Sequence, residues 1–535
     1  SGGAAAATFA VTPATRDVAP GERVRLAAVV RAPDGAVRDV TRRAAWRSSS
    51  WRVARVTAAG VVVGGRPGTA TIRAAQGGRA ASAVVRVGGR ATGPLRVSAA
   101  NPRYFADPAG RVVYLAGGHT WADLVDSGPQ SPPPRFDARR FLDTLLAHGH
   151  NVTRLWAWEQ ATWTAETGGP YHFAPVPFRR TGPGRALDGK PRFDLTRLDP
   201  AYFRRLRARV AAARERGIYT VVMLFDGWSV ERKGPGLMNP WDGHPFNAAN
   251  NVNGVDGDPD GDGDGAATHR LRVPAVTRVQ EAYVRAVVDA VGAQPNVLYE
   301  ISNESSPGSI AWQRRMTRVI RAREAARGLP RHPVGITAEF PGGRNGDLAA
   351  SGADWISPNG SADDPAPGDG RQVVLLDTDH LCGVCGDPGF PWRSLARGVN
   401  PLLMDVWDGR ARGLGAGGID PSEPRWEGIR RALGATVRTA ARLDLARMTP
   451  RGDLASTGYC LADAGPGGSY LVYAPGGGDV TVDLSATPGP LRATWIDPRT
   501  GAPRAGGEVT GGRAVTLAPP AAGDAVLILD ARPAS

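Results

Sequence analysis

Apolar and polar positions alternate in short runs over the first ninety residues, and glycine and proline separate the runs. The clearest runs lie at 9–11, 24–30, 61–63, 69–72 and 83–87. A period of two is that of a strand with one buried face. Several short strands at regular spacing predict a β-sandwich over residues 1–90.

The pattern changes after a glycine-rich linker at 88–94, because strand-like runs then alternate with amphipathic helical segments. Helical periodicity is clearest at 136–148, 202–217, 276–292, 311–328 and 427–445. Eight strand-like runs lie at 112–116, 152–156, 219–224, 297–301, 334–337, 354–357, 373–376 and 402–406. Eight units over 96–450 predict a (β/α)8 TIM barrel. The alternative is a doubly wound open sheet, which the lack of a glycine-rich phosphate loop after the first strand disfavours.

Short strand-like runs return near the end of the chain, at 469–473, 480–484, 491–496, 514–517 and 525–529. They predict a second β-sandwich over 451–535. The fold class is therefore expected to be multidomain, with an N-terminal β-sandwich, a central TIM barrel and a C-terminal β-sandwich.

Composition limits the classes of function. The chain has 535 residues, too many for one ordinary core, and a formal net charge of +14. Nearly all the positive charge is arginine and forms no long basic run. Compositional bias is therefore favoured over a polyanion-binding face, and we expect no nucleic-acid partner. No apolar stretch reaches the roughly 18 residues of a membrane span.

Carboxylates, amides and tryptophans gather where the predicted barrel strands end, which is where TIM barrels place their active sites. Carbohydrate sites need this mixture of two carboxyls for the bond and aromatic faces for the ring. A metal-dependent amidohydrolase-type barrel would need His-x-His on the first strand, which offers a single histidine. The candidate substrate-binding residues are His119, Trp121, Arg154, Trp156, Trp158, Asp226, Trp228, His244, Asn303, His380, Asp405 and Trp407.

Two resemblances to known families follow from these residues. The runs at 45–50, 53–56, 60–64 and 67–72 resemble the bacterial Ig-like domain of the intimin/invasin type, which spaces or attaches other domains. Arg154 on the second strand, Asn303 and Glu304 ending the fourth, an acid ending the seventh and a trailing β-sandwich resemble clan A retaining glycoside hydrolases. More narrowly, residues from about 96 to the end resemble apiosidase-like and collagen-binding-domain type bacterial proteins.

The glycoside hydrolase resemblance implies that Glu304 is the acid/base and that a carboxylate on the seventh strand is the nucleophile. It implies a polysaccharide or oligosaccharide substrate of plant or microbial origin and no required cofactor. The clan usually has glutamate on that strand, whereas this chain offers Asp377 and Asp379. Residues two apart on a strand share a face, so both remain candidates. Retention is expected and inversion stays open, because the shorter aspartate side chain widens the gap between the carboxyls.

A different class of function also remains open, namely a non-catalytic carbohydrate- or matrix-binding surface protein that uses the barrel cleft. The Ig-like module and the missing glutamate favour it, whereas intact Arg154, Asn303 and Glu304 oppose it. Sugar identity and oligomeric state do not follow from the sequence.

Two short motifs lie beside the predicted cleft. Asp258, Asp260 and Asp262 match the start of a calcium loop, but position twelve is His269 instead of the glutamate of an EF-hand. Two interpretations stay open, a structural calcium bound in another geometry and a solvated acidic loop, and the loop is favoured. Cys382 and Cys385 are expected to form a small disulfide and Cys460 to be a buried thiol. Localisation is expected to be secreted or at the cell surface. No signal peptide is present, but because the start reads as a mature N-terminus, this absence does not argue against secretion.

Overall fold

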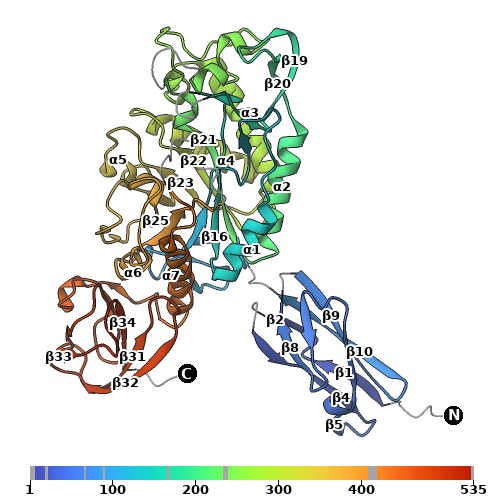
Figure 1. Cartoon of the computed structure of the whole chain (residues 1–535), viewed down its shortest axis with the longest axis vertical. Helices are drawn as coiled ribbons and strands as arrows, with labels where there is room; N and C mark the ends of the chain where they lie inside the picture. The colour runs from blue at the N-terminus through green and yellow to red at the C-terminus, as the bar shows by residue number, and fades with distance from the viewer. Residues whose placement is uncertain are drawn as a thin grey trace. The chain divides into compact units, whose positions relative to one another are not determined.

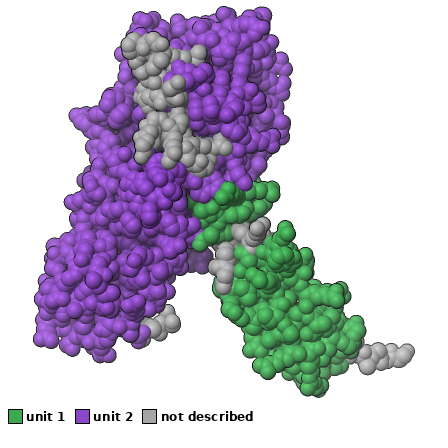
Figure 2. Space-filling view, in the orientation of Figure 1, with its two compact units in different colours: residues 1–91, 139–147, 211–218 green, residues 92–138, 148–210, 219–535 purple. Residues whose placement is uncertain are grey.

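The computed structural model describes residues 7–18, 22–65, 68–87, 91–164, 169–232, 239–407 and 419–531. Residues 88–90 of the predicted linker lie outside these ranges. The chain forms two compact units, which are coloured separately in Figure 2. One contains residues 1–91 with 139–147 and 211–218, and the other contains the rest.

A closed barrel of eight parallel strands occupies the middle of the chain, as predicted (Figure 1). Consecutive strands are neighbours, and the last pairs with the first through Gly117 and Leu402. The strands are rich in β-branched and aromatic residues and are buried on both faces, as parallel strands require. In order they are β14 (Gly117–His119), β16 (Val152–Leu155), β21 (Tyr219–Asp226), β22 (Val297–Asn303), β23 (Val334–Thr337), β24 (Trp355–Ser357), β25 (Val373–Asp377) and β26 (Asn400–Met404).

The first barrel strand differs from the prediction. The apolar run at 112–116 was expected to form it, but its first two residues form β13 (Val112–Val113) in a small sheet with β12 (Phe105–Ala106) and β11 (Arg96–Val97). The barrel strand is the next segment, β14. A Cβ atom on Gly117 would lie 1.9 Å from the carbonyl oxygen of Val152. Only glycine therefore allows this close approach of β14 to β16.

Helices follow the barrel strands along the chain except after β24, and they include the five segments expected from periodicity. The described residues of a long insertion between β21 and α3 form short 3₁₀ turns: η2 (Gly227–Val230), η3 (Trp241–Gly243), η4 (Ala248–Asn250) and η5 (Ala266–His269). The α-helices are α1 (Ala138–His148), α2 (Pro200–Arg214), α3 (Pro274–Val291), α4 (Ile310–Ala326), α5 (Asn345–Ala349), α6 (Phe390–Ala396) and α7 (Pro424–Ala440).

Two further small sheets are formed by residues between β14 and α2. Strand β18 (Tyr171–Ala174) pairs with both β15 (Asp126–Gly128) and β17 (Thr162–Trp163). The strands β19 (Phe178–Arg185) and β20 (Pro191–Leu198) form a hairpin.

The N-terminal region is rich in strands, and its sheets share one apolar core that includes Leu26, Ile72 and Val85. The run at 24–30 was expected to be one strand but divides at buried Leu26 between two sheets. The sheet orders are β1 (Thr8–Thr12)–β4 (Ala27–Arg31)–β5 (Val37–Asp39), β2 (Thr15–Val18)–β10 (Arg79–Val87)–β9 (Gly68–Gln76)–β6 (Ala45–Ser48), and β3 (Arg23–Arg25)–β8 (Val61–Gly64)–β7 (Ala54–Val56).

The C-terminal region forms two antiparallel sheets, which confirms the second sheet-rich region. The side chain of Trp392 on α6 donates a hydrogen bond to the carbonyl oxygen of Pro498, 2.8 Å away. The larger sheet has the order β27 (Thr449–Pro450), β28 (Cys460–Asp463), β29 (Ser469–Ala474), β34 (Ala525–Asp530), β31 (Pro490–Ile496), β32 (Pro503–Thr510), and the smaller pairs β30 (Val480–Asp483) with β33 (Ala514–Leu517).

In the described ranges, no helix combines the length and the apolar character needed to cross a bilayer. The fold class is confirmed by the closed barrel between two sheet-rich regions. The domain boundaries at residues 90, 96 and 450 stay predictions.

Candidate active site

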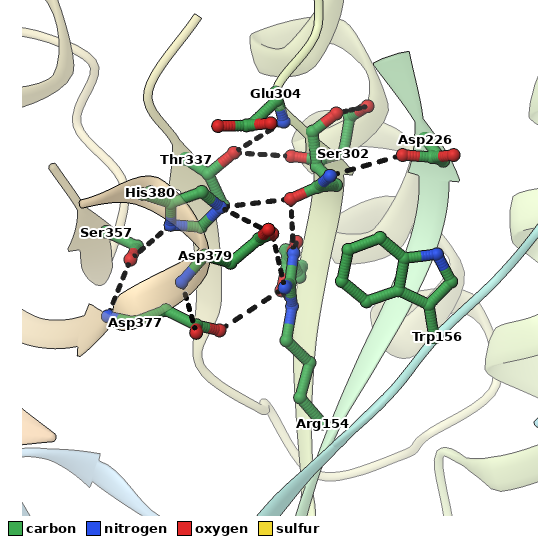
Figure 3. Close-up of polar contacts among 12 residues, drawn as sticks. Arg154, Trp156, Asp226, Ser302, Glu304, Thr337, Ser357, Asp377, Asp379 and His380 are labelled. Carbon is green, nitrogen blue, oxygen red and sulfur yellow. Dashed lines mark hydrogen bonds and ion pairs between the residues drawn. The ribbon is translucent and has the colours of Figure 1, made fainter. Parts of the chain in front are cut away.

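Arg154 on β16 is the centre of a buried charge cluster at the C-terminal end of the barrel (Figure 3). Its Nε and Nη2 atoms donate to the two carboxylate oxygens of Glu300, at 2.7 and 2.6 Å. Its Nη1 atom donates to Asp377 and Asp379, at 3.2 Å each. The side chain is 1% exposed. The fixed fork of a guanidinium suits three carboxylates at once, and the charges compensate one another out of water.

Asp377, the last residue of β25, is held on all sides by protein groups. Its carboxylate oxygens accept hydrogen bonds from Arg154 and from the backbone N–H of Asp379, and His119 Nε2 lies 2.9 Å away. Burial disfavours its charge, but His119 and Arg154 outweigh burial and keep the pKa of Asp377 below its usual range. Asp377 is therefore an ionised residue that orders the site, and its oxygens face partners within the protein.

Asp379 lies in a 3₁₀ turn, η6 (Thr378–His380), and not on the strand as expected. Because Asp377 caps this turn, the alternation of a strand does not apply and the two aspartates have different environments. Asp379 lines the pocket described below, whereas Asp377 does not. Burial and the nearby charge of Glu304 raise the pKa of Asp379, and Arg154 opposes that shift.

Glu304 follows the end of β22 with a backbone φ of +39°, in the left-handed region that non-glycine residues rarely adopt. Its N–H donates to the hydroxyl of Thr337, and the indole N–H of Trp228 donates to its Oε2 at 2.8 Å. Burial raises the pKa of Glu304 to about 7. A carboxyl kept protonated near neutrality is the property of a general acid.

The backbone that holds Glu304 depends on a close approach from the neighbouring strand end. A Cβ atom on Gly227 would lie 2.2 Å from the carbonyl oxygen of Glu304. Strain of this kind costs about 1–3 kcal/mol and persists where the surroundings fix it. Here Thr337, Trp228 and the close-packed Gly227 fix the direction of the Glu304 carboxyl.

Asn303 links the charge cluster to a second network. Its amide oxygen accepts hydrogen bonds from Arg154 at 2.7 Å and from His380 Nε2 at 3.0 Å. Its amide nitrogen donates to Asp226 at 3.2 Å. Burial lowers the pKa of His380 to about 3, so the ring is neutral and Ser357 donates to its other nitrogen. Asn303 is fully buried, and these contacts fix its amide orientation.

Behind Asp226 lies a buried Glu159–His244–His269 cluster that the sequence did not reveal as a unit. The carboxylate of Glu159 lies 3.4 Å from His244 and 3.7 Å from His269, and it accepts the backbone N–H of Asp226. Burial opposes its charge, yet the two histidines lower the pKa of Glu159 to about 2. Since both histidines come from the insertion after β21, this cluster ties the insertion to the barrel.

A pocket of about 550 Å³ opens beside Glu304 and Asp379. A cavity of this size accommodates one or a few sugar rings. Its wall is largely aromatic, and Trp228 and Phe340 stack with an interplanar angle of 14°. The predicted site residues in the wall are Trp121, Trp156, Trp158, Trp228, Glu304, Asp379 and His380. The wall also contains Asn359, Cys382 of the loop motif, and residues that the sequence did not single out, including Trp163, Phe340, Leu381, Met404 and Ile419.

Several predicted substrate-binding residues lie elsewhere. His119 pairs with Asp377, His244 with Glu159, and Asp405 with Arg430 at 2.6 Å. Asp226 pairs with Asn303 and Ser229, and Trp407 packs edge-on against Phe136. None of these five is in the described pocket wall, so the structure gives them positioning or packing contacts.

The two loop motifs have different outcomes. A disulfide joins Cys382 and Cys385, and Cys460 is a buried free thiol, as expected. Carboxylate oxygens of Asp258, Asp260 and Asp262 can lie within 4.8 Å of one another. Asp258 already accepts backbone N–H groups from Gly261, Asp262 and Gly263, so calcium binding there stays a prediction.

Solved structures to which the chain is similar include proteins named as glycoside hydrolases. A glycoside hydrolase family 5 protein from Bacteroides vulgatus is 13% identical, with a TM-score of 0.51 over 82% of this chain and 94% of that one. Another structure called a glycoside hydrolase is 12% identical, with a TM-score of 0.51 over 82% and 97%. At this sequence identity the similarity shows the fold alone. The resemblance to TIM-barrel glycoside hydrolases is therefore confirmed for the fold.

The family models match one part of the chain. Residues 453–530 match the model described as "Putative collagen-binding domain of a collagenase". No curated protein matches the chain. The match covers the C-terminal sheets and leaves the barrel to be interpreted from its own geometry.

We predict that Arg154→Met destabilises the fold by about 3–5 kcal/mol, because Glu300 and Asp377 would remain buried without their cation. Chemical denaturation followed by tryptophan fluorescence measures the change. The matched control is Arg278→Met on the exposed side of α3, expected to stay within about 0.5 kcal/mol. Equal stability of both variants would contradict the role given to Arg154.

The raised pKa of Glu304 also predicts how stability depends on pH. The folded protein holds this proton up to about pH 7, whereas the unfolded chain releases it near 4.5. The contribution is complete below pH 4.5 and is lost as pH rises through 7. Glu304→Gln should therefore melt like the parent at pH 4.5 and be more stable by about 2–3 kcal/mol at pH 8. A constant difference between the two melting curves across this range would be inconsistent with a buried acid.

Proposed function

We propose that this protein is a secreted glycoside hydrolase that cleaves glycosidic bonds of plant or microbial polysaccharides or oligosaccharides by a retaining double displacement. The observation that carries the proposal is the pair of carboxyls, Glu304 and Asp379, in one aromatic pocket. Arg154 contacts only Asp379 of the two. We assign the proton of the pair to Glu304 and the negative charge to Asp379, because this direct ion pair with Arg154 opposes the burial and the Glu304 charge that raise the pKa of Asp379.

The mechanism follows from that asymmetry. Glu304 donates its proton to the glycosidic oxygen while a carboxylate oxygen of Asp379 bonds to the anomeric carbon and the leaving group departs. Glu304, now ionised, then takes a proton from water as the water oxygen displaces Asp379. The tryptophans of the wall stack on sugar rings, and Arg154 keeps the nucleophile ionised.

Secretion is supported by one structural feature. The Cys382–Cys385 disulfide borders the pocket, and disulfides persist in oxidising compartments outside the cytosol. The disulfide restricts the conformations of the loop that follows Asp379. This is consistent with a site that works outside the cell.

We expect Glu304→Gln and Asp379→Asn each to lower kcat/KM by about 1,000-fold or more on a cleavable glycoside. Asp377→Asn serves as the comparison, because it removes an ordering charge and not the nucleophile. Azide should restore turnover to Asp379→Asn with an inverted glycosyl azide and leave Asp377→Asn unchanged. Rescue of Asp377→Asn alone would assign the nucleophile to Asp377.

The pH profile and the stereochemistry provide a second test. Activity should fall as pH rises through about 7, because Glu304 then loses the proton that the leaving group needs. NMR of the first-formed anomer should show retention, and inversion would exclude Asp379 as a covalent nucleophile. If the parent cleaves nothing across a broad glycan panel, the non-catalytic binding protein becomes the better account.

A further inference from the structure

Positive charge is unevenly distributed along the chain. Residues 1–91 contain fifteen arginines and four acidic residues, with no lysine or histidine. Eleven of the fourteen net positive charges of the chain therefore lie in about its first sixth. Basic and acidic residues nearly balance in the remainder. Compositional bias acts on a whole chain and does not account for an excess confined to one region.

Four arginines of this region lie exposed without a carboxylate partner. Within the described ranges, Arg23, Arg47, Arg55 and Arg73 make no side-chain hydrogen bond or ion pair. Some arginines of the barrel segment have carboxylate partners, and Arg321, for example, pairs with Glu324 and Asp354. The guanidinium groups of Arg23, Arg47, Arg55 and Arg73 are therefore available to an external anion.

The strand register places these arginines in pairs. Arg47 on β6 is the direct cross-strand partner of Arg73 on β9. Direct partners in an antiparallel sheet share a face with Cβ atoms about 4.5–5.5 Å apart, and like charges there are destabilising. In the sheet formed by β3, β8 and β7, Arg23 on β3 and Arg55 on β7 both pair with Val63 on β8, one from each side. Each sheet thus presents two arginines in one row, at an electrostatic cost that an anionic ligand would remove.

An exposed aromatic side chain lies close in sequence to one of these rows. Trp51 is 66% exposed and follows β6. The guanidinium carbon of Arg52 lies 5.6 Å from the centre of its ring. An exposed indole offers an apolar face to a sugar ring, and a guanidinium binds a carboxylate through two parallel hydrogen bonds.

We propose that residues 1–91 bind an acidic polysaccharide, a polyuronate whose carboxylates meet the arginine rows. The choice of a polysaccharide over other polyanions rests on the proposed function, because the barrel pocket is assigned to a glycan. Binding by this region keeps the enzyme on a charged polymer while the barrel acts on accessible bonds. This is an interaction surface separate from the carboxyl pair of the barrel.

The test uses the full chain and polygalacturonate, with neutral galactan, duplex DNA and anionic phospholipid vesicles as comparison ligands. Isothermal titration and affinity electrophoresis at low and high salt measure binding. The test variant changes four arginines to glutamine: Arg23, Arg47, Arg55 and Arg73. The matched control makes the same change at four exposed arginines outside the region: Arg204, Arg278, Arg318 and Arg492.

We expect the parent to bind polygalacturonate more tightly than every comparison ligand, with affinity that falls as salt rises. The test variant should lose about tenfold or more in affinity, and the control should stay within about twofold of the parent. Unfolding curves of both variants must match the parent. Equal binding by the test variant would overturn the proposal, as would tighter binding to DNA, vesicles or galactan.

Because the readout is binding, it separates this proposal from the proposed function. A chain that binds polygalacturonate through these arginines but cleaves no glycan would retain the binding surface and lose the enzymatic assignment. A chain that cleaves glycans and binds polygalacturonate no better than galactan would retain the assignment and lose the surface.

Discussion

A single buried cation organises the site. The Arg154 side chain is withdrawn from water and contacts Glu300, Asp377 and Asp379. Burying a charge costs free energy unless the charge is paired and hydrogen-bonded. Removing any one of the four groups would therefore leave the others with uncompensated buried charge. This constraint sets the positions of β16, β22 and β25 relative to one another. It also creates the electrostatic difference between Glu304 and Asp379 on which the proposed chemistry depends.

The order of the barrel strands could be predicted because seven of the eight lie in apolar runs, many of them separated by segments with helical periodicity. The first was misplaced for a physical reason. The run at 112–116 has higher strand propensity than Gly117–His119, but barrel closure is decided by how closely a backbone can approach its neighbour. Gly117 meets that requirement because it has no Cβ atom. Propensity is a local property, whereas closure depends on contacts distant in sequence.

The site was predictable where chemistry follows a strand end and less so where it depends on tertiary contacts. Arg154, Glu304, Asp377 at the end of β25 and Asp379 in the following turn lie in one cluster (Figure 3), and Asn303 contacts Arg154. Glu300 was overlooked, although a charged residue inside an apolar strand must have a buried partner. The stacked pair of Trp228 and Phe340 could not be foreseen, because its members come from loops after different strands. The separate environments of Asp377 and Asp379 arise from a 3₁₀ turn that strand alternation does not anticipate.

The central claim is that the Arg154 cluster leaves the proton on Glu304 and the charge on Asp379. Carbon-13 NMR titration of carboxyl-labelled glutamate, with Glu304 assigned by comparison with Glu304→Gln, measures this directly. The account predicts a Glu304 pKa of about 7 in the parent and a lower value in Asp379→Asn, where the neighbouring negative charge is absent. A value near 4.5 that is unchanged in Asp379→Asn would contradict it.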